Sequence, residues 1–350
     1  MGSWSIYRPH LTSLIHLYHR FAPSLRPPVL LCEIIRRCTW YLIGCGSFNE
    51  ALTVTKKACE ILELAVKNKN HPGYSSRYVD RLTTQLYLMN GTSEYELNLP
   101  GHGRSWYEKV QFPRKQVIDG IITERVDLKV MAIRNGNLSL AALAETGPTD
   151  SDIQPVDLAI LSFKHIFDNF EQANSRGVWA CNLSMAYRLK GMLEESWKWC
   201  EIANTWILKG EGAKSLHMAT LHYCAGNTLL AQKNERKASI AFEQCLQTRY
   251  QKVPSHPFTG YTWHKVGLLK RAKGDLDVAI ACLNRAIKIF DGCEGQAGAA
   301  IRSQFVLSSI FLEKGAFDDA ESIKQEVIRD LEELGDPVTG EDLTEEYLDR

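Results

Sequence analysis

A turn signal recurs along the second half of the chain at nearly constant spacing. It falls at Gly191, Lys233, Gly274 and Gly315, so the successive intervals are 42, 41 and 41 residues. On both sides of each turn, apolar and small residues recur every three to four positions, as in a helix that buries one face. Each copy therefore predicts a hairpin of two antiparallel helices, and four copies in register predict a stack of such hairpins.

The copy at residues 263–287 shows the unit most clearly. Before its turn it carries Trp263, Val266 and Gly267, and the small residues Gly267, Ala279 and Ala286 are expected to let the two helices approach closely. After the turn, the apolar and small positions are Leu276, Ala279, Leu283, Ala286 and Ile287. This arrangement resembles the tetratricopeptide repeat, whose pattern runs W-x2-L-G-x2-Y, then a turn with Gly, then A-x3-F-x2-A.

The period of about 42 residues exceeds the usual repeat of about 34 residues, which implies longer helices or longer connections. The dipeptide His256-Pro257 lies between two copies, and His71-Pro72 follows a weaker copy near residues 35–58. A His-Pro start with a long period resembles the repeats of kinesin-light-chain type. It also resembles the repeats of fungal NACHT or NB-ARC proteins and of related stand-alone repeat proteins. The resemblance covers about residues 180–350 well and residues 30–66 moderately.

The resemblance implies an all-α fold, a right-handed solenoid of about seven antiparallel helix pairs. The expected organisation is a basic segment or capping helix over 1–29, one repeat over 30–69, degenerate helical repeats over 70–176, four repeats over 177–334 and an acidic tail over 335–350. Within the degenerate region, glycine and proline residues predict loops over residues 91–103 and 146–154.

Composition excludes several classes of protein. Lysine and arginine number 41, as do aspartate and glutamate, and this balance argues against a dedicated nucleic-acid binder. No apolar stretch approaches the roughly 18 residues of a membrane-spanning helix. The ten cysteines form no C-x-x-C pair and sit among apolar residues, which predicts buried free thiols in a reducing compartment such as the cytoplasm. Import into an organelle stays open as an alternative, because residues 1–32 are basic and contain no acidic residue.

The motifs of known catalytic sites are missing. The chain has no G-K-[ST] phosphate loop and no G-x-S-x-G nucleophile elbow. His16 and His19 form an H-x-x-H, but no cysteine or acidic residue lies at metal-ligand spacing from them, so they are expected to be surface histidines. His102 lies between two glycines, a context more typical of a turn than of a catalytic site. We therefore expect no enzyme activity, no cofactor and no metal.

The resemblance also implies a function. In a solenoid of this family the first helix of each pair lines a concave surface, which binds a protein or peptide partner. Transferring the repeat register places eight residues of this chain in that groove: Arg188, Tyr223, Asn227, Tyr261, His264, Arg271, Arg302 and Phe305. The leading hypothesis is a non-enzymatic scaffold or adaptor. The alternative is an accessory protein of a fungal biosynthetic pathway that acts with or on small molecules. Self-association is open too, because residues 1–115 and 318–350 carry net charges of +7 and −10.

Overall fold

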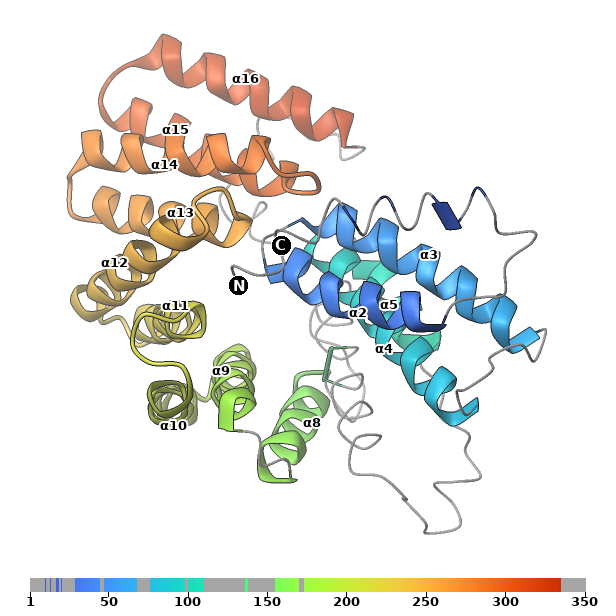
Figure 1. Cartoon of the computed structure of the whole chain (residues 1–350). Helices are drawn as coiled ribbons and strands as arrows, with labels where there is room; N and C mark the ends of the chain where they lie inside the picture. Colours follow the sequence, from blue (N-terminus) through green and yellow to red (C-terminus); the bar gives the residue numbers. More distant parts are fainter. Residues whose placement is uncertain are drawn as a thin grey trace. The chain divides into compact units, whose positions relative to one another are not determined.

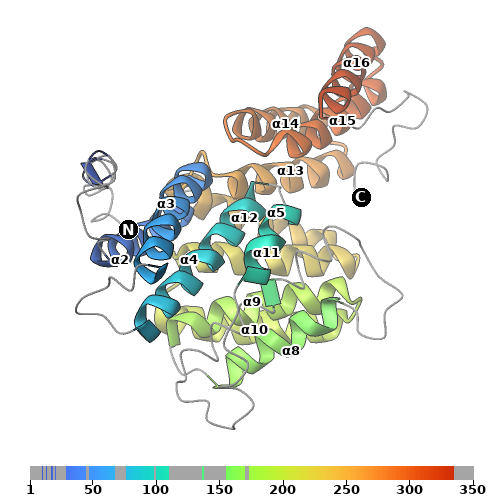
Figure 2. The ribbon, with the colours of Figure 1, turned by 90° about the vertical axis from the view of Figure 1, so that its right-hand side faces the viewer.

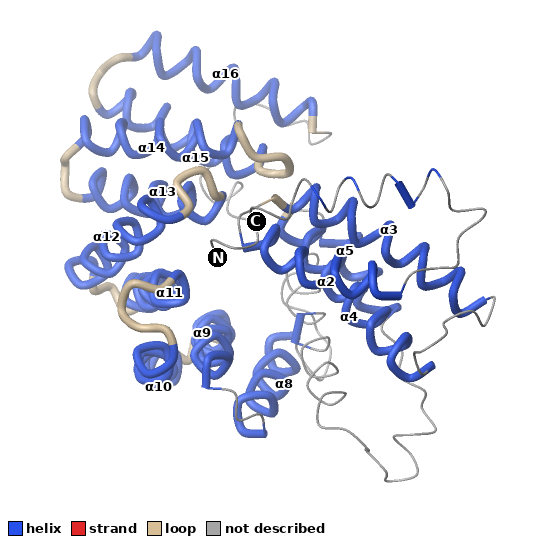
Figure 3. The backbone as a smooth tube through the Cα atoms, in the orientation of Figure 1, coloured by secondary structure: helices blue, strands red, loops and turns tan. Residues whose placement is uncertain are grey.

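The computed structural model describes two compact units, residues 1–171 and 172–350. Within them, the described residues are 10, 13, 17, 18, 20, 29–44, 47–67, 76–97, 100–109, 136–137, 155–169 and 173–334. These residues form helices and no strand (Figure 3). The predicted all-α class is therefore confirmed for the described part of the chain.

The described residues of the second unit, 173–334, form four helical hairpins that follow one another along the chain (Figure 1). Their helices are α9 (Ala173–Leu189) with α10 (Leu193–Gly210), α11 (Leu216–Ala231) with α12 (Glu235–Lys252), α13 (Pro257–Ala272) with α14 (Leu276–Asp291), and α15 (Ala297–Glu313) with α16 (Phe317–Glu333). We call α9, α11, α13 and α15 the first helices, and α10, α12, α14 and α16 the second helices.

All four predicted turns lie between the two helices of a hairpin. The backbone φ angle is positive at each of them: +80° at Gly191, 60° at Lys233, +80° at Gly274 and +75° at Gly315. This left-handed conformation ends a helix by satisfying its last carbonyl groups, and glycine adopts it without steric cost. Lys233 is the only residue with a side chain that takes this conformation in the described part of the chain.

Replacing Lys233 with glycine is expected to raise the free energy of unfolding by about 0.5–1 kcal/mol, because glycine relieves the steric cost of the left-handed conformation. Gly274→Ala is the matched reverse change and is expected to cost about 1 kcal/mol. Because a Cβ atom at Gly274 meets no atom within 4 Å, that cost comes from the backbone alone. Urea denaturation followed by circular dichroism measures both. A destabilised Lys233→Gly variant would show that the lysine side chain contributes more than its backbone costs.

The two layers of helices in this unit pack differently. Each second helix packs against the first helix of the next hairpin, as α10 does on α11 and α12 on α13. First helices also pack on one another, at α9–α11 and α13–α15. Over residues 173–334, second helices of neighbouring hairpins form no comparable contact. The first helices therefore form the more closely packed layer.

Close approach within a hairpin depends on glycine residues opposite large side chains. A Cβ atom at Gly226 of α11 would lie 2.7 Å from the ring of Phe242 of α12. Gly260 of α13 faces Phe290 of α14 in the same way, also at 2.7 Å. Since real Cβ atoms do not approach so closely, only glycine permits these two helix pairs to pack as they do.

A buried chain of hydroxyl groups joins the first hairpin to the second. Ser196 of α10 donates to the Ser184 carbonyl of α9 at 2.8 Å, and its Oγ lies 2.8 Å from Thr228 Oγ1 of α11. All three residues are buried. Because each hydroxyl finds a partner inside the protein, these hydrogen bonds offset the cost of removing the hydroxyl groups from water.

The first unit also contains packed helix pairs: α2 (Val29–Gly44), α3 (Phe48–Lys67), α4 (Ser76–Glu96) and α5 (Pro100–Lys109) (Figure 2). Helix α2 packs on α3, α3 on α4, and α4 on α5. Helix α8 (Pro155–Asn169) lies later in the same unit. Buried Asn90 of α4 accepts a hydrogen bond from Thr55 of α3 and donates to the Cys59 sulfur at 3.6 Å, which ties two of these helices together.

The predicted loop over residues 91–103 is wrong for most of its length. Helix α4 continues to Glu96, and α5 already begins at Pro100. The reason is Gly91, which does not break the helix. It lies directly against the ring of Tyr107 of α5, where a Cβ atom would clash. A glycine that permits helix contact and a glycine that forms a turn look alike in a sequence.

Several predictions concern residues outside the described part. These are the loop over 146–154, the turn at Gly46, the tail over 335–350 and most of the segment 1–29. The domain boundaries therefore stay predictions. The predicted free thiols are confirmed for the nine described cysteines, of which seven are buried. Burial raises the pKa of both Cys32 and Cys59 to about 12, so these thiols are neutral at physiological pH.

Candidate protein-binding face

Charge is distributed unevenly between the two layers of the second unit. The first helices contain one acidic residue, Glu313, against six lysines and arginines. The second helices contain 14 acidic residues against ten basic ones. Glu313 is itself held by Arg271 in an ion pair of 2.7 Å. The first-helix layer therefore offers basic and aromatic groups with almost no competing carboxylate.

Three of the predicted groove residues bridge α13 and α15. The Tyr261 hydroxyl donates to Gln296 Oε1 at 2.7 Å, just before α15 begins. His264 Nδ1 lies 2.9 Å from Ser303 Oγ of α15, and Arg271 pairs with Glu313 at the end of that helix. These side chains therefore hold two first helices together. Some of their hydrogen-bonding groups are already paired within the chain.

Desolvation lowers the pKa of His264 to about 3, with the positive charges of Lys265 and Arg302 adding to the effect. The ring is therefore neutral at pH 7. Unfolding restores a pKa near 6.5, so the unfolded chain binds a proton more tightly between about pH 6.5 and pH 3. Stability contributed by the neutral ring is thus lost as the pH falls through this window.

Lowering the pH from 7 to 5 is expected to reduce the free energy of unfolding of the wild type. The same change should reduce that of a His264→Gln variant by about 1–2 kcal/mol less. Glutamine can keep a hydrogen bond to Ser303 but carries no titrating group. Urea denaturation of both proteins at the two pH values measures the difference. An equal loss in the two proteins would mean that His264 does not contribute to the pH dependence.

Tyr223 and Asn227 lie one turn apart on α11. The Tyr223 ring packs edge-on against Phe242 of α12, with ring centroids 5.5 Å apart. Burial raises the pKa of Tyr223 to about 12, so its hydroxyl stays protonated. The Asn227 amide donates to the Tyr223 carbonyl at 2.9 Å. Both side chains are half-buried, which leaves part of each available to a partner.

The last three predicted residues occupy different settings. Arg188 of α9 and Arg302 of α15 are half-buried, and neither pairs with a carboxylate in the described part of the chain. Phe305 packs partly against the core between α15 and α16, which includes Val327. The eight predicted residues therefore do not form one cluster. Three join α13 to α15, and the others are spread over three first helices.

Arg249 of α12 belongs to this region, although sequence reasoning did not single it out. Its side chain is buried, and its guanidinium carbon lies 5.0 Å from the ring centre of Tyr223. Its position in the sequence could have revealed that it is buried, because Arg249 continues the apolar stripe of Phe242 and Cys245 at helical spacing. A basic residue on the buried face of a helix is unusual and marks a position with a specific role.

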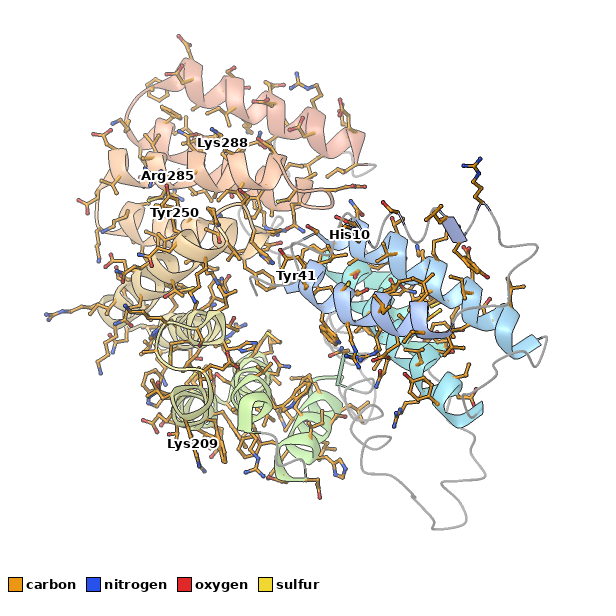
Figure 4. The ribbon with its side chains drawn as sticks, in the orientation of Figure 1. His10, Tyr41, Lys209, Tyr250, Arg285 and Lys288 are labelled. Atoms are coloured by element: carbon orange, nitrogen blue, oxygen red, sulfur yellow. The ribbon has the colours of Figure 1, made fainter. Side chains whose placement is uncertain are left out.

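A second aromatic and basic cluster lies on the second-helix side. Trp263 of α13 meets Tyr250 of α12 edge-on, with ring centroids 6.2 Å apart, and Arg285 of α14 lies 4.6 Å from the Trp263 ring centre. Figure 4 labels Tyr250, Arg285 and nearby Lys288. Unlike Arg249, Arg285 is exposed, so it is stacked on an aromatic ring but not enclosed.

Two kinds of feature are absent from the described residues. No group of histidine, cysteine and acidic side chains there has the arrangement of a metal site. No helix among them is long and apolar enough to cross a membrane.

Comparison with known proteins identifies the repeat. A model of the tetratricopeptide repeat matches residues 217–292, which span α11 to α14. A sequence search of curated proteins finds no match.

Solved structures of similar fold span most of the chain. A Rap protein complexed with competence and sporulation factor superposes with a TM-score of 0.62 and 14% identity, covering 88% of this chain and 78% of that one. BtubC from P. vanneervenii gives 0.52 and 13%, covering 70% and 93%. A signal-transduction ATPase with a tetratricopeptide repeat sensor from Pyrococcus horikoshii gives 0.53 and 12%, covering 93% of this chain and 47% of that one. Residues 217–292 are therefore tetratricopeptide repeats, and the chain has a solenoid fold of the tetratricopeptide-repeat type.

Proposed function

We propose that the chain is a non-enzymatic adaptor whose first-helix layer, in residues 173–334, binds an extended segment of a protein partner. The observation that carries this proposal is the separation of charge between the layers. Four first helices present half-buried aromatic and basic side chains with one acidic residue, and that residue is already paired. Aromatic and arginine side chains of this kind dominate the energetics of protein interfaces.

The fold supports the same proposal. Tetratricopeptide-type solenoids expose a long surface that binds protein partners, and each hairpin needs only its neighbours to fold. The Rap protein of similar fold is complexed with competence and sporulation factor, so a solenoid of this kind accommodates a separate factor in that protein. Within the proposal, Arg188, Tyr223, Asn227, Arg302 and Phe305 contact the partner directly. Tyr261, His264 and Arg271 position α13 against α15 and contact the partner with their remaining surface.

Site-specific photo-cross-linking tests which layer binds. A benzoylphenylalanine residue replaces Asn227 on the first helix α11 or, as the control, exposed Gln247 on the second helix α12. Irradiation in the native cell is expected to link one protein to position 227 and not to position 247. Links of equal yield at both positions, or none at position 227, would overturn the proposal. We place this function in the cytoplasm, because the described cysteines are free thiols, as is usual in a reducing compartment.

Self-association is a separate prediction of the sequence, and the charge of α16 bears on it. This helix carries seven acidic residues and two basic ones. Association through opposite charges weakens as salt screens them. Sedimentation velocity at about 20 mM and 500 mM salt is therefore expected to show a larger species only at low salt. A sedimentation coefficient that does not change with salt would rule out this mode of association.

A further inference from the structure

Two cysteines on neighbouring first helices are in direct contact. Cys181 of α9 is 2% exposed, and Cys224 of α11 is half-buried. Their thiols are hydrogen-bonded to each other, and the two helices that carry them pack on one another. The proposed adaptor function makes no use of either thiol.

The neighbouring hydroxyl groups fix the helix faces that carry this pair. Ser184 lies one turn after Cys181 on α9, and Thr228 lies one turn after Cys224 on α11. Ser196 of α10 reaches both hydroxyl-bearing residues, since it donates to the Ser184 carbonyl at 2.8 Å and its Oγ lies 2.8 Å from Thr228 Oγ1. The contact between the two thiols is therefore part of a continuous, hydrogen-bonded junction between the two first helices.

The two thiols of the pair differ in their readiness to ionise. The Cys181 thiol donates its hydrogen bond to the Cys224 sulfur, which lowers the pKa of Cys224 and raises that of Cys181. The positive charges of Arg249 and Arg188 lower the pKa of Cys224 further, although burial opposes them. The other eight described cysteines all have raised pKa values. Cys224 is therefore the described cysteine that is best suited to react as a thiolate.

Cys293 shows that partial exposure alone does not distinguish Cys224. It is also a half-buried free thiol, but burial raises its pKa and its sulfur donates to the Ser255 carbonyl at 3.4 Å. What sets Cys224 apart is the second thiol in contact with it. A reactive thiolate beside a second cysteine is the arrangement of a thiol pair that is oxidised reversibly.

We propose that Cys181 and Cys224 are an oxidation site at which a hydroperoxide, such as hydrogen peroxide, produces a reversible disulfide between α9 and α11. A disulfide needs sulfur atoms about 2.05 Å apart on backbones that lie close together, and two hydrogen-bonded thiols on packed helices need only a small movement to meet this condition. Reversible disulfides of this kind occur in reducing compartments as redox sensors.

The chemistry proceeds in two steps. The Cys224 thiolate attacks one oxygen of hydrogen peroxide, the O–O bond breaks, and the hydroxide that leaves takes up a proton to become water. The Cys181 sulfur then attacks the sulfenic acid formed at Cys224, so that an S–S bond forms as the S–O bond breaks and a second water leaves. In sum, the two thiols lose two electrons and two protons, and one peroxide molecule becomes two molecules of water.

Peptide mapping without reductant tests the disulfide. The full chain is treated with about 0.1 mM hydrogen peroxide, and the remaining thiols are blocked with N-ethylmaleimide in urea before digestion with trypsin. Cleavage after lysine and arginine places Cys181, Cys200, Cys224 and Cys293 on separate peptides, residues 177–188, 199–209, 215–233 and 289–302. Mass spectrometry therefore measures the oxidation of each of these cysteines separately.

Hydrogen peroxide is expected to join peptide 177–188 to peptide 215–233, and Cys224 should lose its free thiol at least about fivefold faster than Cys293. Dithiothreitol should restore both thiols. In Cys181→Ser the hydroxyl group can keep the hydrogen bond but cannot form a disulfide, so sulfenic acid at Cys224 should accumulate and react with dimedone. The matched control, Cys293→Ser, should form the disulfide at the wild-type rate.

If Cys181→Ser does not fold, the linked peptides and the two oxidation rates of the wild type still decide. The proposal is wrong if peptides 177–188 and 215–233 stay unlinked, if Cys224 pairs instead with Cys200, or if Cys224 and Cys293 are oxidised at equal rates. These measurements use the chain without a partner. A protein that cross-links to position 227 in the absence of any disulfide at Cys224 would leave the adaptor function standing and remove the oxidation site. A disulfide without a cross-linked partner would do the reverse.

Discussion

Replacing Phe290 with alanine is expected to lower the free energy of unfolding by about 3–5 kcal/mol. The Phe290 side chain is 1% exposed and lies at the junction of α13, α14 and α15. Its neighbours include Gly260, Ala286, Ala299 and Ala300, none of which has a flexible side chain that could move into the vacated space. The half-buried Tyr261 and Trp263 also pack against this cluster, so the movement of their rings sets where in this range the cost falls.

Urea denaturation followed by circular dichroism measures this loss, and Phe317→Ala is the matched control. Phe317 is 68% exposed at the start of α16, so the same change there is expected to alter stability by no more than about 0.5 kcal/mol. Equal losses at the two positions would contradict the packing described for α13, α14 and α15.

The opposite change, adding volume, is expected to be nearly as costly at Gly226. A valine there is expected to cost about 2–3 kcal/mol, because even its Cβ atom would lie 2.7–2.9 Å from three carbons of the Phe242 ring. Phe242 is fully buried and cannot turn aside without displacing other core residues. Helices α11 and α12 must therefore separate.

A double-mutant cycle identifies the contact responsible. Phe242→Leu shortens the opposing side chain, so Gly226→Val should cost at least 1 kcal/mol less in the Phe242→Leu background than in the wild type. Ala231→Val, at an exposed position at the end of the same helix, controls for the effect of valine on helix formation. Strict additivity of the two changes would mean that the cost of Gly226→Val arises elsewhere.

The repeats could be predicted because their signal is local and recurs. Glycine marks three of the four turns, and the constant period placed the fourth at Lys233, where the residue itself gives no such indication. Prediction was wrong around Gly91 because no second copy at a fixed distance showed whether that glycine belonged to a turn or to a helix contact. Tyr107, which explains it, lies 16 residues further on and on another helix.

The candidate site was less predictable, for a different physical reason. The family register identifies side chains that share a helix face, but it does not specify what the neighbouring helix places opposite them. His264 and Arg271 meet Ser303 and Glu313, 39 and 42 residues away, and only the packing of α13 on α15 brings these pairs together. The buried Arg249 of α12 contacts Tyr223 of α11 and Phe258 of α13, so no pattern within a single segment could reveal these surroundings.

The unequal packing of the two layers also has a mechanical consequence. At each of the three junctions between hairpins, the first helix packs against the second helix of the preceding hairpin. The second helices of the two hairpins make no comparable contact with each other. At α9–α11 and α13–α15, where the first helices also pack on one another, the junction can therefore act as a hinge whose pivot lies near the first helices. Small rotations at successive hinges add up along the array, so the curvature of the binding layer can adjust to the segment it holds while the hairpins themselves stay rigid.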